Sequence, residues 1–158
     1  MNVGWPVVDE GTELLVAARS VAPRGDHPFE GYTRMAAPSP AWVEEVFEHE
    51  VAAEGDGRVP AALVNRAAGL GAYEVFRADQ LPWLWVWRML GEGTYVVGIE
   101  PATNRTAGRL DARERGELIE LGPGESRGYE LELGALDGPA EIEAFARRVA
   151  AVNVIAPG

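Results

Sequence analysis

The hydrophobic pattern is most regular between positions 83 and 100. Tryptophan stands at every second position from Trp83 to Trp87, and this period of two predicts a β-strand. Gly91-Glu92-Gly93 follows as a turn, because glycine tolerates positive φ. Tyr95–Ile99 is rich in β-branched residues and predicts the returning strand. We therefore expect the chain to be organised around this hairpin, with Glu100 at its end.

The length of this turn decides which residues share a face with Glu100. An even loop places Glu100 opposite Trp85 and Gly98 opposite Trp87, which gives a tryptophan wall beside a notch without a side chain. An odd loop places Glu100 on the same face as Arg88 instead. A slip of one residue exchanges the two faces, so the sequence leaves both registers open.

Shorter patterns of the same kind recur along the chain and predict further strands. Proline and glycine interrupt 22–40 so often that we expect a loop there. Asp111–Glu117 is a mixed run of charges and predicts a solvated loop. The tail differs, because apolar residues three and four apart predict one amphipathic helix over Pro139–Val152. The pattern indicates an all-β fold, a sandwich of mostly antiparallel strands with one C-terminal helix. The other predicted strands are Leu14–Ala18, Trp42–Val51, Val59–Asn65, Gly71–Ala78, and a hairpin of Leu118–Leu121 with Arg127–Leu136.

Composition narrows the class of function. A length of 158 residues predicts a single domain over 1–158. The net charge of −11 argues against nucleic acid and anionic membranes as partners. Without cysteine there is no disulfide framework, thiol nucleophile or thiolate metal site. No apolar stretch resembles a leader or a membrane span, so we expect a cytoplasmic protein.

We expect no cofactor and no metal. The Gly-x-Gly runs at 91–93 and 122–124 are turns, since neither opens a helix after a strand. His27 and His49 lack the spacing of metal ligands. His49 stands between two acids on a predicted strand, and we expect it at the surface with its proton mildly favoured.

Glu100 is the candidate that carries chemistry. A buried carboxylate at the end of an apolar strand is costly unless it has a partner. It is therefore either half of an ion pair or a functional group. A glycosidase would require a second acid across a cleft. The candidate ion-pair partners are Arg88, Arg105 and Arg109, and the candidate second acids are Glu92, Asp79 and Glu74.

The string MLGEGTYVVGIEPATN at 89–104 resembles the C-terminal part of aldose 1-epimerase (galactose mutarotase)-like proteins, closest to an uncharacterised bacterial branch. Four shorter pieces fit in the same order, so the resemblance covers nearly the whole chain. It implies a galactose-mutarotase-like β-sandwich, of which this chain supplies only the later portion. The four pieces are 2–6, 46–49, 121–125 and 131–138.

The resemblance also implies a site. Glu100 matches the glutamate that acts as base toward the anomeric hydroxyl, and Trp85, Trp87, Arg88 and Asn104 suit contacts with a monosaccharide. Such proteins carry a histidine where this chain has Met1, so we expect weak sugar binding without efficient mutarotation. A non-catalytic carbohydrate-binding module and a purely structural module remain the alternatives. Missing strands would leave exposed sheet edges, which predict a homo-oligomer.

Overall fold

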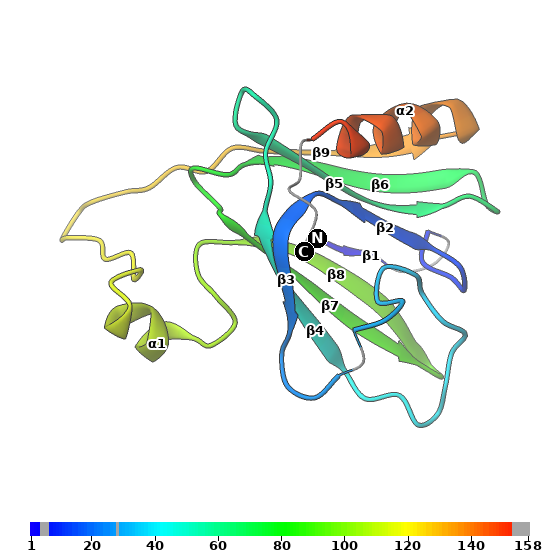
Figure 1. Cartoon of the computed structure of the whole chain (residues 1–158), viewed down its shortest axis with the longest axis horizontal. Helices are drawn as coiled ribbons and strands as arrows, with labels where there is room; N and C mark the ends of the chain where they lie inside the picture. The colour runs from blue at the N-terminus through cyan, green and yellow to red at the C-terminus, as the bar shows by residue number, and fades with distance from the viewer. Residues whose placement is uncertain (4–6, 28, 153–158) are drawn as a thin grey trace.

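Two antiparallel β-sheets packed face to face make up the body of the molecule in the computed structural model, which describes residues 1–3, 7–27 and 29–152 (Figure 1). The five-stranded sheet, here sheet A, has the order β1-β8-β7-β4-β3, and the four-stranded sheet B has the order β2-β5-β6-β9. The predicted all-β sandwich is confirmed. Sheet A contains β1 (Asn2–Val3), β3 (Ala18–Pro23), β4 (Glu45–Val51), β7 (Trp83–Gly91) and β8 (Thr94–Ala102); sheet B contains β2 (Glu13–Val16), β5 (Arg58–Asn65), β6 (Leu70–Arg77) and β9 (Leu131–Asp137).

Side chains at every second position of the strands fill the space between the sheets. Every second residue of β7 turns inward and is buried against apolar residues from β5, as the period of two requires. The inward residues include Leu84, Val86, Val97 and Ile99 from sheet A, and Val59, Ala61, Leu63 and Phe76 from sheet B.

A second apolar layer lies on the opposite face of sheet B. Helix α2 (Pro139–Ala150) covers this face with Ile142, Phe145 and Val149, which recur at helical spacing. Pro139 occupies the first turn, where its missing N–H costs nothing, and Arg147 and Arg148 lie in the last turn. Sheet B is therefore covered on both faces along much of its width (Figure 1).

The turn of the central hairpin is the even one. Gly91 pairs with Thr94, so the loop consists of Glu92 and Gly93, and Gly93 adopts a φ of 79° that favours glycine. This register places Glu100 opposite Trp85 and Gly98 opposite Trp87.

The loop predicted over 22–40 is confirmed for most of its length, since β3 ends at Pro23 and the described residues from 24 to 40 form only isolated bridges. Two other local predictions were wrong. Leu118–Leu121 is not a strand in the described structure, and β9 pairs with β6 instead, through a contact between distant segments. The charged run forms the short helix α1 (Arg109–Glu114), in an arm of residues 107–130 that projects from the sandwich (Figure 1).

Candidate functional site

The outer face of sheet A, which points away from sheet B, gathers the tryptophans of β7. Trp83, Trp85 and Trp87 lie on this face because the residues between them point into the core. Trp83 is buried, whereas Trp85 and Trp87 are half-buried. We call this surface the tryptophan face.

Cross-strand rows set the neighbours of each tryptophan. Trp85 lies between Glu48 of β4 and Glu100 of β8, and Trp87 lies between Val46 and Gly98. Adjacent strands are about 4.8 Å apart, so the backbones of Glu48 and Glu100 are about 10 Å apart. Two carboxylates therefore flank one indole ring.

Glu100 is half-exposed at the end of its row. Within the described residues its side chain forms no hydrogen bond and no ion pair, whereas Arg105 pairs with Glu48 and Glu117 at 3.7 and 3.4 Å. The ion pairs considered for Glu100 are thus not formed in this structure. No described side chain therefore competes with a ligand on the tryptophan face for hydrogen bonds to its carboxylate.

A short segment after β8 closes one end of this face. The Trp85 Nε1–H donates to the carbonyl oxygen of Asn104 at 3.0 Å, and the Asn104 Nδ2–H donates to the carbonyl oxygen of Arg105 at 3.0 Å. The guanidinium of Arg105 lies 3.9 Å from the centre of the Trp83 ring, a cation–π contact. Asn104 therefore joins the site, with its backbone oxygen already engaged.

Glu48 is a site residue that sequence reasoning did not select. Its Oε2 accepts a hydrogen bond from the Thr106 hydroxyl at 2.9 Å, which ties the closing segment to β4. Alternation could have found it, since Glu48 has the parity of Glu50 and the opposite parity to the buried Phe47. At the other end of the face, the Trp87 Nε1–H donates to Glu44 Oε2 at 3.2 Å.

Arg88 lies on the opposite face of β7, which corrects its predicted place among the sugar contacts. It is buried between the sheets, where its Nε–H donates to Glu45 Oε2 at 3.1 Å and one Nη1–H donates to the carbonyl oxygen of Tyr32 at 2.6 Å. Its guanidinium also packs 5.1 Å from the Phe47 ring centre. The even turn is the reason, because it places Arg88 and Glu100 on opposite faces.

His49 is also inside the sandwich, which contradicts the predicted surface position. It is fully buried, with Nδ1 3.2 Å from the Leu84 carbonyl oxygen and Nε2 3.0 Å from the Tyr32 hydroxyl. The carbonyl accepts from Nδ1–H, so Nε2 is left to accept from the tyrosine. Burial lowers the pKa of His49 to about 4. The neighbouring acids point to the other face of β4.

A second buried acid, Glu74, was considered only as a partner for a glycosidase mechanism. It lies on β6 with 1% of its surface exposed, and neither carboxylate oxygen has a hydrogen-bond partner within the described structure. Burial raises the pKa of Glu74 to about 7; the Met1 amino group opposes the rise and the charge of Glu100 adds to it. Glu74 and Glu100 are therefore electrostatic neighbours on different sheets.

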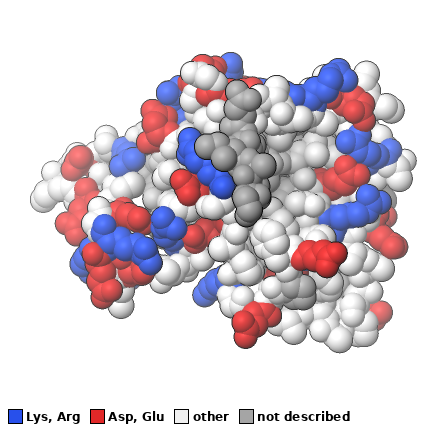
Figure 2. All heavy atoms as spheres, in the orientation of Figure 1, with Lys and Arg blue, Asp and Glu red and all other residues white. Residues whose placement is uncertain are grey.

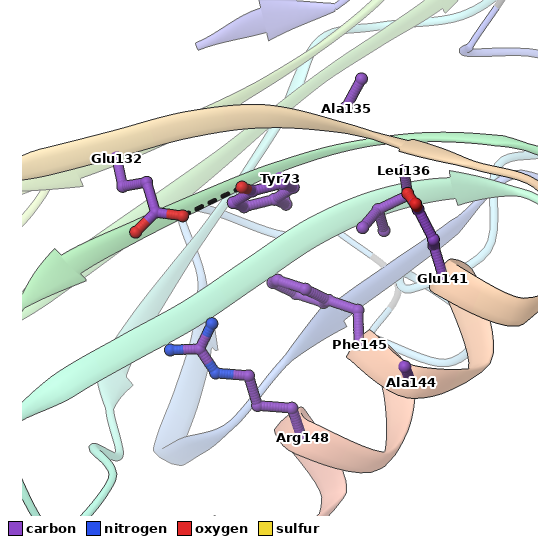
Figure 3. A pocket seen from close by; sticks show the side chains of 8 residues that line it. All are labelled: Tyr73, Glu132, Ala135, Leu136, Glu141, Ala144, Phe145 and Arg148. Atoms are coloured by element: carbon purple, nitrogen blue, oxygen red, sulfur yellow. Dashed lines mark hydrogen bonds between the residues drawn. The ribbon is translucent and has the colours of Figure 1, made fainter.

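Hollows also lie along sheet B, away from the tryptophan face. One of about 340 Å³ lies between β9 and α2, where the Tyr73 hydroxyl donates to Glu132 Oε1 at 2.9 Å and the Tyr73 ring packs 5.1 Å from that of Phe145 (Figure 3). Arg148, at its edge, is held by Glu54 at 2.8 Å. These polar groups already satisfy one another, so we do not place the site here.

The described residues contain neither a cluster of metal ligands nor a membrane-spanning helix. No group of three or more His, Asp or Glu side chains there could hold a metal ion. No helix in the described ranges is long and apolar enough to cross a membrane.

Comparison with known proteins first shows the class of fold, which is a galactose-mutarotase-like β-sandwich. It is similar to the crystal structure described as "a putative aldose 1-epimerase" from Klebsiella pneumoniae subsp. pneumoniae MGH 78578, with a TM-score of 0.89 and 28% sequence identity over 96% of this chain. The predicted resemblance is thus confirmed for the fold. The chain spans about two fifths of that structure, 41% of its length.

The family follows from the sequence itself. Residues 1–135 match the model of DUF4432, a domain of unknown function, and the chain belongs to this family. No curated protein matches the sequence.

Proposed function

We propose that the protein binds a monosaccharide on the tryptophan face, with Glu100 as the group that would act as base in an aldose 1-epimerase-like reaction. The observation that carries this proposal is the row in which half-exposed Glu100 lies opposite Trp85, without an ion pair to a described residue. Indole faces pack against the C–H surface of a sugar, and a free carboxylate accepts hydrogen bonds from its hydroxyls.

The chemistry requires two proton transfers. Glu100 would take the proton from the anomeric hydroxyl, and an acid would protonate the ring oxygen so that the ring opens, rotates about C1–C2 and closes again. The proteins that this chain resembles carry a histidine at the position of Met1, and His49 lies in the core between the sheets. A missing general acid typically costs on the order of 10²–10⁴ in rate. We therefore expect sugar binding with little mutarotation.

Trp85, Trp87 and Asn104 are the proposed sugar contacts, and Arg88 is withdrawn because Glu45 and Tyr32 hold it in the core. The methionine at the position of the expected histidine favours the alternative of a carbohydrate-binding module without turnover. A cytoplasmic location and correspondence to the later portion of a longer protein stay predictions.

The experiment compares the parent chain with Glu100→Gln and with Glu92→Gln, a matched control in the exposed turn of the same hairpin. Titration calorimetry with glucose and galactose should show weak binding to the parent and the control, and weaker binding to Glu100→Gln. Polarimetry should show at most slow mutarotation, which Glu100→Gln abolishes.

Two outcomes would contradict the proposal in different ways. Fast mutarotation that Glu100→Gln leaves intact would remove Glu100 from the mechanism. Binding that is equal in all three proteins would move the sugar site away from this row.

A further inference from the structure

The sandwich is open along β9. Its register with β6 places Leu131 opposite Phe76 and Leu133 opposite Glu74, so both leucines point to the core side of sheet B. They are nevertheless 49% and 60% exposed. The next residue on this side, Ala135, is exposed as well. We call these three positions the open flank.

The acid next to the open flank lacks a partner. Glu74 is the cross-strand neighbour of Leu133, and its buried carboxylate accepts no hydrogen bond within the described residues. A carboxylate without donors is costly in a buried place. A core-side position that combines exposed leucines with an unsatisfied acid indicates a surface that another polypeptide covers.

A hollow beside the start of β9 is large enough to receive a side chain from a partner. A hollow of about 360 Å³ lies there, and Phe76, Tyr129 and Leu131 are among its lining residues. Exposed apolar surface that borders a hollow is typical of an interaction site.

The arm of residues 107–130 leads directly into β9 and carries apolar residues of its own. Leu110 and Leu121 are 72% and 54% exposed, although this segment projects from the sandwich (Figure 1). Exposed Arg109 and Arg113 accompany Leu110 on α1, while Glu130 and Glu132 accompany the leucines of β9. Acidic and basic side chains mix over the arm, at the lower left of Figure 2.

We propose that the open flank is the interface of a homodimer, in which the arm of each copy packs over the open flank of the other. A second copy is the occupant because one chain carries both halves of the contact: apolar with apolar, and arginine with glutamate. The two halves follow one another in the chain, since the arm runs directly into β9. A two-fold axis between two copies would then form the contact twice.

The first experiment measures mass by sedimentation equilibrium at micromolar concentrations. The parent should be a dimer. Leu133→Glu and Leu110→Glu should each weaken it at least about tenfold, as for a buried interface residue. Val43→Glu is the matched control, because Val43 is 69% exposed and lies in neither the arm nor β9. Circular dichroism should show that all four proteins are folded.

The second experiment tests the exchange of arms. A mixture of Leu133→Glu and Leu110→Glu can form one contact in which arm and flank are both unaltered, whereas neither variant alone can. The mixture should therefore associate more tightly than either variant.

Three results would overturn the inference. A parent chain that stays monomeric would show that a second copy does not cover the open flank. A dimer that neither leucine variant weakens would place the interface elsewhere. A mixture no tighter than the separate variants would exclude reciprocal packing of the arms.

Discussion

At the scale of single residues, buried polar groups differ in whether the fold satisfies them. Arg88 is held by Glu45 and by the Tyr32 carbonyl, and His49 bonds through both ring nitrogens. Glu74 has no such partners within the described residues. Breaking a buried pair costs far more than losing an exposed one, so the first two residues stabilise the core, whereas Glu74 strains it.

Glu74→Gln should stabilise the protein at high pH. The pKa of Glu74 is raised from 4.5 to about 7, so its contribution is favourable below the unfolded pKa and is lost as the pH rises through about 7. This shift corresponds to about 3 kcal/mol. Urea unfolding should show Glu74→Gln more stable than the parent by up to this amount at about pH 8, and nearly equal to it at about pH 4, below the unfolded pKa.

The buried His49 makes the stability of the protein depend on pH in the opposite direction. The lowered pKa of His49 gives stability that is present above 6.5 and lost as the pH falls toward about 4. Both proteins of the comparison contain His49, so its contribution cancels in their difference. A difference that does not depend on pH would mean that Glu74 is ionised at neither pH, or solvated at both.

At the scale of elements, the close packing of β9 against the Tyr73 ring of β6 depends on a glycine. A Cβ on Gly134 would lie closer to the Tyr73 ring than van der Waals contact allows. Gly134→Ala should therefore turn the ring away from Phe145 and Glu132, and destabilise the protein by about 1–3 kcal/mol. Thermal unfolding would measure this against Gly128→Ala, where nothing lies within 4 Å of the added carbon. Equal melting temperatures would mean that Tyr73 adapts without cost.

Local patterns explain why the central hairpin could be predicted from sequence. Alternation marked β7, β-branched residues marked β8, and the spacing of Ile142, Phe145 and Val149 marked α2. The register was left open, because it depends on whether the turn contains two or three residues. The structure has the two-residue turn, which places Trp85 and Glu100 on one face of the hairpin and Arg88 on the other.

Contacts between distant segments explain the rest. β9 pairs with β6 across more than fifty positions of sequence, so no turn motif between the two strands predicts this pairing. Glu48 joins the candidate site only because β4 lies beside β7. His49 looked like a surface residue among acids, yet its parity with Phe47 and Val51 places it in the core.

At the scale of the whole molecule, the sandwich and the arm should differ in their resistance to local unfolding. The sandwich has two apolar layers, whereas the arm of residues 107–130 projects from it. Amide hydrogen exchange should be slowest in β7, β8 and β4, and fast in the arm at low protein concentration. If the arms pack in a dimer, exchange in the arm and β9 should slow as concentration rises, while exchange in β3 stays unchanged. An arm equally labile at all concentrations would contradict this prediction.

The tryptophans of β7 have an optical consequence. Successive rings on one side of a strand are spaced by about 7 Å, close enough for their electronic transitions to couple. The far-ultraviolet dichroism of the folded protein should therefore contain an exciton signal that vanishes when β7 loses its strand geometry. A molecule that stacks on Trp85 or Trp87 would alter their emission, while Trp83 beneath Arg105 would respond less. The protein thus carries its own spectroscopic probe, and a search for ligands can begin without any label.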